Sequence, residues 1–281
     1  MANRHFRFTG AGPSVIQALA TRRPMPEQVR KAMDQICIEA TKRDTLIWID
    51  AEQQRFQETI DQWTIEMMRK YNTNGRARVY NTIQAYLKAA PDNILRHLKL
   101  ASEEGWSAGF KLVRGAYIAT EPRHLIHDTK EDTDTAYDAC TADLLAQRFP
   151  GFRSGSSFPK VELFLASHNE ASVKNACQIQ RQRVLSNQPL TPLGYGQLQG
   201  MADEISCELL QMCKESGQST DTEKAALRPN TFKFLSWGTV QECMQYLVRR
   251  AVENQGAIER TKQWAGAFRG ELWRRMASVG R

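Results

Sequence analysis

Short runs of apolar residues alternate along this chain with longer stretches in which apolar residues recur at helical spacing. Each run is nearly continuous in apolar residues, which is typical of a strand buried on both faces of a parallel sheet. The predicted strands cover residues 45–49, 78–83, 109–113, 161–166 and 231–235. Between them, the spacing of apolar residues predicts helices near residues 56–67, 92–104 and 170–180.

Strands that alternate with helices of ten or more residues predict a parallel sheet, either closed into a barrel or doubly wound. No Gly-rich GxGxxG turn follows any of these strands, so the usual signature of a dinucleotide-binding open sheet is missing. A barrel commonly takes about 250 residues as one domain. We therefore expect one α/β barrel domain over residues 1–281.

The N-terminal segment admits two interpretations. The first thirty residues carry five arginines and a single acid, Glu27, as a mitochondrial transit peptide would. Residues 5–9, however, alternate like a strand, residues 10–13 suit a turn, and residues 14–19 open a helix. We favour the second interpretation, in which the chain enters the barrel almost at once.

Three other segments lack clear periodicity. Residues 120–138 are rich in charge and are predicted to form a long loop or short helices over the barrel mouth. Residues 148–159 and 216–230 are predicted to be surface insertions.

The composition of the chain limits the classes of partner that we expect it to bind. The net charge is +7, but the basic residues are dispersed and form no basic arm, so no nucleic acid is expected as a partner. The six cysteines form no CxxC pair, which indicates buried free thiols in a reducing compartment and no metal site. No apolar run approaches the ~20 residues needed to cross a bilayer, so any membrane contact would be peripheral.

The strongest chemical signal lies in residues 239–254. Thr239 and Glu242 form a capping box that predicts a helix start. The helix would carry an apolar stripe made of Val240, Cys243, Met244, Leu247 and Ala251. An adjoining strip holds Tyr246, Arg249, Arg250 and Glu253. Two neighbouring guanidinium groups suit a carboxylate or a phosphate, although a solvated face with Arg–Glu pairs would give the same pattern.

Further candidates lie where predicted strands end. Asp50 and His168 each follow an apolar strand, and the carboxyl ends of barrel strands form the rim of the active site. For His168, a purely structural histidine is the alternative. The segment Lys111–Tyr117 ends another strand, and its Gly115 would permit the backbone to approach a flat or anionic ligand closely.

Taken together, six segments resemble the proline dehydrogenase family, in particular its fungal mitochondrial branch. They are residues 48–52, 80–88, 111–117, 166–169, 196–201 and 246–254. The resemblance implies a distorted (βα)8 TIM-type barrel that holds FAD and oxidises L-proline to pyrroline-5-carboxylate. It further implies hydride transfer from a proline ring carbon to the flavin N5, electron transfer to a quinone, and a location on the matrix side of the mitochondrial inner membrane.

The same resemblance assigns residues to roles. Arg249 and Arg250 match the pair that binds the proline carboxylate, with Asp50 as the acid that orients them. The walls of the proline pocket are matched by Tyr117, Leu198 and Tyr246. The cofactor side is matched by Gln84, Lys111, Arg114, Gly115, Ala116, His168 and Glu253, the last of which supports the arginine helix. Lys111 or Arg114 would supply a cation near the flavin.

Two substitutions and one missing segment separate this chain from the family pattern. Arg7 stands where the family usually has a lysine, and Phe234 stands where it typically has a tyrosine. The lost hydroxyl admits an alternative activity on hydroxyproline or another cyclic amino acid. The resemblance also begins almost at residue 1, without the family's preceding helices. A truncated, inactive homologue is therefore a second alternative.

Overall fold

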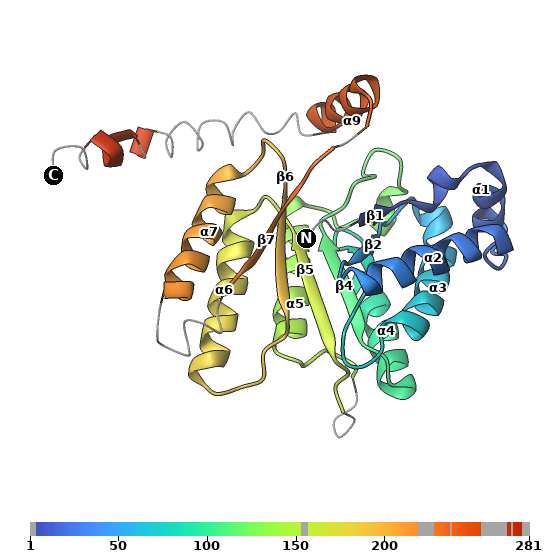
Figure 1. Cartoon of the computed structure of the whole chain (residues 1–281), viewed down its shortest axis with the longest axis horizontal. Coiled ribbons are helices and arrows are strands. Elements are labelled where there is room, and N and C mark those ends of the chain that lie inside the picture. Colours follow the sequence, from blue (N-terminus) through green and yellow to red (C-terminus); the bar gives the residue numbers. More distant parts are fainter. Residues whose placement is uncertain are drawn as a thin grey trace.

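Seven strands, all parallel, form one curled sheet in the described part of the chain (Figure 1). The computed structural model describes residues 4–152, 157–218, 228–236, 238–253, 269–270 and 272–276, with only the backbone of residues 215–218 and 249–253. The strands are β1 Arg4–Phe6, β2 Ile47–Ile49, β3 Val79–Gln84, β4 Ala108–Val113, β5 Val161–Ala166, β6 Leu193–Leu198 and β7 Asn230–Phe234.

Each strand pairs with the next in chain order, so the carboxyl ends of all the strands meet at one edge of the sheet. Among the described residues no ladder joins β7 back to β1. The predicted barrel class is confirmed, and it takes the form of a curled, incompletely closed sheet.

Helices follow the strands and cover the outer face of the sheet (Figure 1). They are α1 Pro13–Ala20, α2 Glu27–Lys42, α3 Gln54–Tyr71, α4 Ala90–Glu104, α5 Lys130–Leu145, α6 Glu170–Leu185 and α7 Asp203–Gln218. Two short 3-10 helices, η1 Phe8–Ala11 and η2 Arg123–Leu125, lie in loops. Helix α9, Val240–Glu253, follows β7 and lies beyond the carboxyl edge of the sheet.

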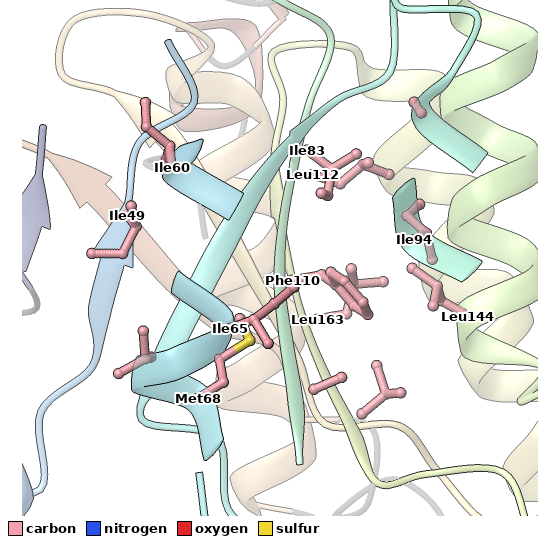
Figure 2. Packing of buried hydrophobic residues seen from close by; sticks show 14 of the residues in the cluster. Ile49, Ile60, Ile65, Met68, Ile83, Ile94, Phe110, Leu112, Leu144 and Leu163 are labelled. Carbon is pink, nitrogen blue, oxygen red and sulfur yellow. The ribbon is translucent and has the colours of Figure 1, made fainter. Parts of the chain in front are cut away.

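The outer face of the sheet packs on the helices through a large apolar core. In each strand alternate residues point outward, as the period of two requires. Figure 2 shows Ile49, Ile83, Phe110, Leu112 and Leu163 of the strands facing Ile60, Ile65 and Met68 of α3, Ile94 of α4 and Leu144 of α5. Each such side chain contributes about 1.5–3 kcal/mol by leaving water. This core anchors the strands that carry the site.

The inner face holds a second, aromatic core. Trp48 and Phe164 lie with ring centroids 4.4 Å apart, and Tyr80 packs with them. The ring of Phe164 fills the space over two glycines of β6. A Cβ added to Gly196 would lie 2.5 Å from the Phe164 ring, and one added to Gly194 would lie 2.8 Å from it. The base of the curl is therefore filled largely by aromatic rings, among which the Tyr80 hydroxyl donates to Glu162 at 2.8 Å.

The predicted strands are confirmed to within two residues at each end. The prediction for residues 120–138 is wrong in part, because α5 begins at Lys130 behind a complete capping box of Thr129 and Asp132. The strand predicted through Thr9 stops at Phe6, where the backbone turns into η1. The sixth strand was missed, because its two glycines interrupt the apolar pattern. Residues 153–156 and 219–227, inside the predicted insertions, lie outside the described residues.

All six cysteines are free. The expectation that they are buried holds for Cys37 and Cys140 and is wrong for Cys207, which is exposed. Within the described residues no helix is long and apolar enough to cross a bilayer.

Candidate active site

Three strands bring a histidine, a carboxylate and an ammonium group together inside the carboxyl end of the curl. Lys111 of β4 donates from Nζ to Oδ1 of Asp50, directly after β2, at 2.8 Å. Nδ1 of His5, on β1, lies 3.1 Å from the same carboxylate oxygen and 3.1 Å from the Lys111 nitrogen. The three side chains are only 10% to 28% exposed.

Burial and the charges in this cluster determine which of its side chains are ionised. Burial alone would raise the pKa of Asp50, but the positive charge of Lys111 and the hydrogen bond from His5 outweigh it and place that pKa well below its usual range. Burial, together with the charge of Lys111, lowers the pKa of His5 below its ordinary value of 6.5. At neutral pH, Asp50 is therefore ionised and His5 is neutral.

The rim above this cluster is formed by Arg7 and Tyr117. The Arg7 guanidinium donates to the Tyr117 hydroxyl, and its Nε lies 3.9 Å from a carboxylate oxygen of Glu52. Glu52 is buried and accepts a hydrogen bond from the backbone of Thr9 at 3.0 Å. The predicted pocket residues Arg7 and Tyr117 thus lie side by side, and Glu52 holds the loop after β1 in place.

Arg114 is fixed by partners on two helices and a loop. Its Nε donates to Asp134 at 2.5 Å, and its two Nη atoms donate to the hydroxyls of Ser167 and Ser172 at 2.8 Å. The guanidinium also lies over the Tyr137 ring, 4.4 Å from the centroid. Arg114 therefore ties the end of β4 to α5 and α6, and its charge is matched by Asp134.

Gln84 holds the loop that follows β4. Its side-chain oxygen accepts from the Ala116 amide at 3.1 Å, and its amide group donates to the Glu52 carbonyl at 3.3 Å. Gly115 has a different reason from the one the sequence suggested. A Cβ at that position would lie 2.4 Å from the ring of Tyr86, so the glycine makes room for this side chain, and its predicted closeness to a ligand stays a prediction.

His168 links the ends of β5 and β6. Its Nε2 accepts a hydrogen bond from the Leu198 amide at 3.0 Å, which leaves the ring proton on Nδ1 in the neutral form. Leu198 ends β6 on the inner face. Both residues lie at the rim, as predicted from the position of strand ends.

Helix α9 reaches the rim through an aromatic contact. The rings of Phe234 and Tyr246 lie 5.7 Å apart, and Phe234 also contacts the His5 ring edge to face at 4.8 Å. Arg249 and Arg250 follow Tyr246 by about one helical turn. Their side chains, and that of Glu253, lie outside the described residues, so their predicted roles stay predictions.

The start of α9 is as predicted, but its apolar stripe is not buried. Thr239 donates from its backbone nitrogen to the Glu242 carboxylate at 2.9 Å, and the Glu242 amide donates to the Thr239 hydroxyl at 3.3 Å. Val240 and Met244 are 81% and 53% exposed. Among the described residues, α9 therefore depends on its cap and on Tyr246 more than on a packed face.

Sequence reasoning missed His5 and Glu52. Both carried a usable signal. His5 alternates with Arg7 in the first predicted strand, which places the two on one face, and Glu52 lies two residues after Asp50. The pairing of His5 with residues 45 and 106 positions away could not be read from either segment.

Comparison with known proteins shows the family of the chain. A family model described as proline dehydrogenase matches residues 4–263. The chain belongs to the proline dehydrogenase family. It is 35% identical over 254 residues to the probable mitochondrial proline dehydrogenase of Schizosaccharomyces pombe, which covers 86% of this chain and 49% of that protein. It is 32% identical over 288 residues to mitochondrial proline dehydrogenase 1 of Homo sapiens. That alignment covers 98% of this chain and 44% of the human protein.

Two further matches bear on substrate and fold. The hydroxyproline dehydrogenase of Rattus norvegicus is 32% identical over 206 residues, which is 70% of this chain and 40% of that protein. Proline utilization A from Bdellovibrio bacteriovorus, inactivated by N-propargylglycine, superposes with a TM-score of 0.68 at 19% identity, covering 89% of this chain and 24% of that one. The latter shows a shared barrel fold. The chain spans about half the length, or less, of the curated relatives it matches.

Proposed function

We propose that this chain oxidises L-proline to pyrroline-5-carboxylate with FAD as hydride acceptor and a quinone as the final electron acceptor. The observation that carries the proposal is the family match over residues 4–263, which includes every strand that brings a polar residue to the mouth. Asp50, Lys111, Phe234 and Tyr246, all assigned by the family resemblance, gather at that mouth.

The inner face fits a polar cofactor. Nε1 of Trp48 and Oγ1 of Thr82 are buried polar atoms that have no hydrogen-bond partner in the described part of the chain. Thr82 lies opposite Lys111 in the strand register, so an unpaired hydroxyl and a cation are adjacent. Buried polar groups generally find a partner, so these atoms suit a bound polar ligand or water.

Residues at the ends of β3 to β5 would hold FAD. They are Gln84, Lys111, Arg114, Gly115, Ala116 and His168. Glu253 would support α9. When bound, FAD accepts a hydride from the ring carbon next to the proline nitrogen. Lys111 would supply a positive charge to offset the negative charge that the reaction gives the cofactor, and Asp50 keeps that ammonium group oriented.

Substrate binding is assigned to α9 and the rim. Arg249 and Arg250 would bind the proline carboxylate, because the guanidinium fork matches a carboxylate bidentately. Tyr117, Leu198, Phe234 and Tyr246 would line the ring of the substrate, with Arg7 as a third cation at the rim. Such positioning accelerates the reaction by holding the reacting carbon against the acceptor.

The proposed location is mitochondrial, as in the names of the relatives from S. pombe and human. A membrane-bound quinone would require the protein to reach the bilayer surface. The exposed apolar residues of α9, with Val240 at 81% exposed, support a peripheral contact there.

The test is the colour of the protein. Protein purified with added FAD should show flavin absorbance, and anaerobic L-proline should bleach it, because the reduced flavin absorbs less. A protein that takes up no FAD would overturn the proposal for this chain. A bound flavin that neither proline nor 4-hydroxyproline reduces would indicate the inactive homologue.

A hydroxyproline activity is the second candidate, favoured by Phe234 and by the match to the rat hydroxyproline dehydrogenase. The same anaerobic assay with 4-hydroxyproline decides between the two. Faster bleaching by hydroxyproline than by proline would favour this second candidate.

A further inference from the structure

His5 has no role in the proposed chemistry so far, although it lies between the Asp50–Lys111 pair and the pocket residue Phe234. We propose that His5 is the base that takes the proton from the substrate ammonium before hydride transfer. This inference rests on the proposed oxidation of proline, or of a similar cyclic amino acid.

The chemistry requires such a step. At neutral pH the ring nitrogen of a cyclic amino acid is an ammonium group, which has no lone pair. In the balanced step the N–H bond breaks and its proton passes to Nε2 of His5. The C–H bond next to nitrogen then breaks, its electron pair leaves as hydride to the flavin, and the nitrogen lone pair forms the C=N bond. The immediate products are the reduced flavin and an iminium ion, which still carries one N–H proton. That proton is later lost to solvent to give the imine, and His5 returns its own proton to solvent.

The geometry of His5 suits a base. Nδ1 lies 3.1 Å from the ionised Asp50 carboxylate, which only accepts hydrogen bonds, and 3.1 Å from the Lys111 nitrogen, which already donates to Asp50. In the tautomer that a base at this position requires, Nδ1 donates to Asp50. Nε2 then carries the lone pair. In the described part of the chain Nε2 has no hydrogen-bond partner, and the side chain is 19% exposed. An ammonium group in the mouth can therefore reach it.

Neighbouring rings set the direction of the lone pair. The His5 ring contacts Trp48 at 4.8 Å and the Phe234 ring at 4.8 Å, so it is held from two sides. Phe234 in turn packs on Tyr246 of α9, the helix that carries the arginine pair.

The charged groups around His5 support both of its protonation states. They are Asp50 after β2, Lys111 on β4, Arg7 just past the end of β1, and the phenol of Tyr246 beyond Phe234. Burial and the charge of Lys111 lower the His5 pKa, so the ring is neutral near pH 7, which is the state a base must have before it accepts a proton. Asp50 then stabilises the imidazolium that forms.

The test compares anaerobic flavin reduction by proline in the wild type, His5→Gln and the control His124→Gln, in which an exposed histidine of η2 is changed in the same way. Near pH 7, His5→Gln should reduce the flavin at least about a hundredfold more slowly, the low end of what a general base contributes. Near pH 10 an alkyl ammonium begins to lose its proton unaided, so the variant should approach the wild-type rate. His124→Gln should behave as the wild type throughout.

Three results would overturn the inference. The first is an unchanged rate in His5→Gln near pH 7. The second is a loss that is the same at every pH, which indicates a purely structural role. The third is measured on the wild type alone, so it applies even if the variant fails to fold. It is a rate of wild-type flavin reduction that keeps rising about tenfold per pH unit above neutrality, because that would mean that only the free amine reacts. A wild type that proline fails to reduce at any pH would instead reject the proposed function itself.

Discussion

At the scale of single residues, cations near the mouth are paired with acids that come from other segments. Lys111 lies beside Asp50, and Arg114 lies beside Asp134. Partly buried pairs of this kind gain little net stability, because desolvation offsets the attraction between the charges. What they do provide is orientation. Each cation is held in one direction, which is what a site for an anionic cofactor and a carboxylate substrate needs.

Behind β3, a second group of polar residues is fully enclosed. His97 is buried, its Nδ1 donates to the Asn93 carbonyl at 2.8 Å, and its Nε2 lies 3.0 Å from the amide nitrogen of Asn81. Asn81 also donates to Asp61 at 2.7 Å. These bonds fix His97 as a neutral ring that joins α4 to the sheet.

We expect His97 to make the free energy of unfolding depend on pH. Burial is the main cause that lowers its pKa below the ordinary 6.5. Below about pH 6.5 the unfolded state therefore binds a proton that the folded state does not, and the free energy of unfolding falls as the pH falls. His97→Gln should lower that free energy by about 1–3 kcal/mol near pH 7 through lost hydrogen bonds.

The measurement is urea unfolding between about pH 7 and pH 5. Across this range the free energy of unfolding should fall less in His97→Gln than in the wild type. The part of the fall that is due to His5 should remain in the variant. His124→Gln serves as the control, since its side chain is exposed. A His97→Gln slope equal to that of the wild type would contradict the assignment.

At the scale of elements, α5 and α9 begin with the same kind of cap but differ in packing. Thr129 and Asp132 cap α5, and Thr239 and Glu242 cap α9. Helix α5 buries Tyr137, Leu144 and Leu145 against the sheet. In α9, Val240 and Met244 are mostly exposed, so less packing supports the helix in the described residues.

The effect of removing the cap should therefore extend further along α9 than along α5. Thr239→Ala removes about 1 kcal/mol, or roughly fivefold in the opening equilibrium, and the backbone amides of the whole helix should exchange faster by that factor. In Thr129→Ala the faster exchange should stay in the first turn of α5, because its later turns are packed. Hydrogen exchange measured by mass spectrometry checks both variants. Thr239→Ala with unchanged exchange beyond its first turn would contradict this account.

At the scale of the whole molecule, the sheet has two cores of different kinds. Aliphatic side chains dominate the outer core, and aromatic rings fill the base of the curl (Figure 2 shows the outer one). The inner core depends on glycines in β6, since Phe164 occupies the space where side chains of residues 194 and 196 would lie. The curvature of the sheet thus depends on pairs of large and small residues from adjacent strands.

We expect Gly196→Ala to lower the free energy of unfolding by about 1–3 kcal/mol, because the new methyl group overlaps the Phe164 ring. The cost should be smaller in a Phe164→Leu background, which removes the overlapping atoms. A double-mutant cycle by urea unfolding measures this difference. Gly10→Ala is the matched control, since nothing lies within 4 Å of its added Cβ. Equal costs in both backgrounds would show that ring overlap is not the cause.

The sequence by itself determined the class of fold, most strand positions, the start of α9 and the candidate residues at strand ends. Periodicity carries this information, because it states which residues share a face and where an element begins. It was silent on α5, whose mixed face gives a weak pattern, and on β6, whose glycines make sense only beside Phe164.

Only the tertiary structure decided which groups meet. His5, Asp50 and Lys111 are separated by 45 and 61 residues along the chain, yet they form one hydrogen-bonded cluster. The physical reason is that the period of a strand fixes a face but not a neighbour. The neighbour follows from the order and register of the strands, which place His5 opposite Trp48 and Thr82 opposite Lys111, and from the curl that carries Phe234 of β7 back to β1.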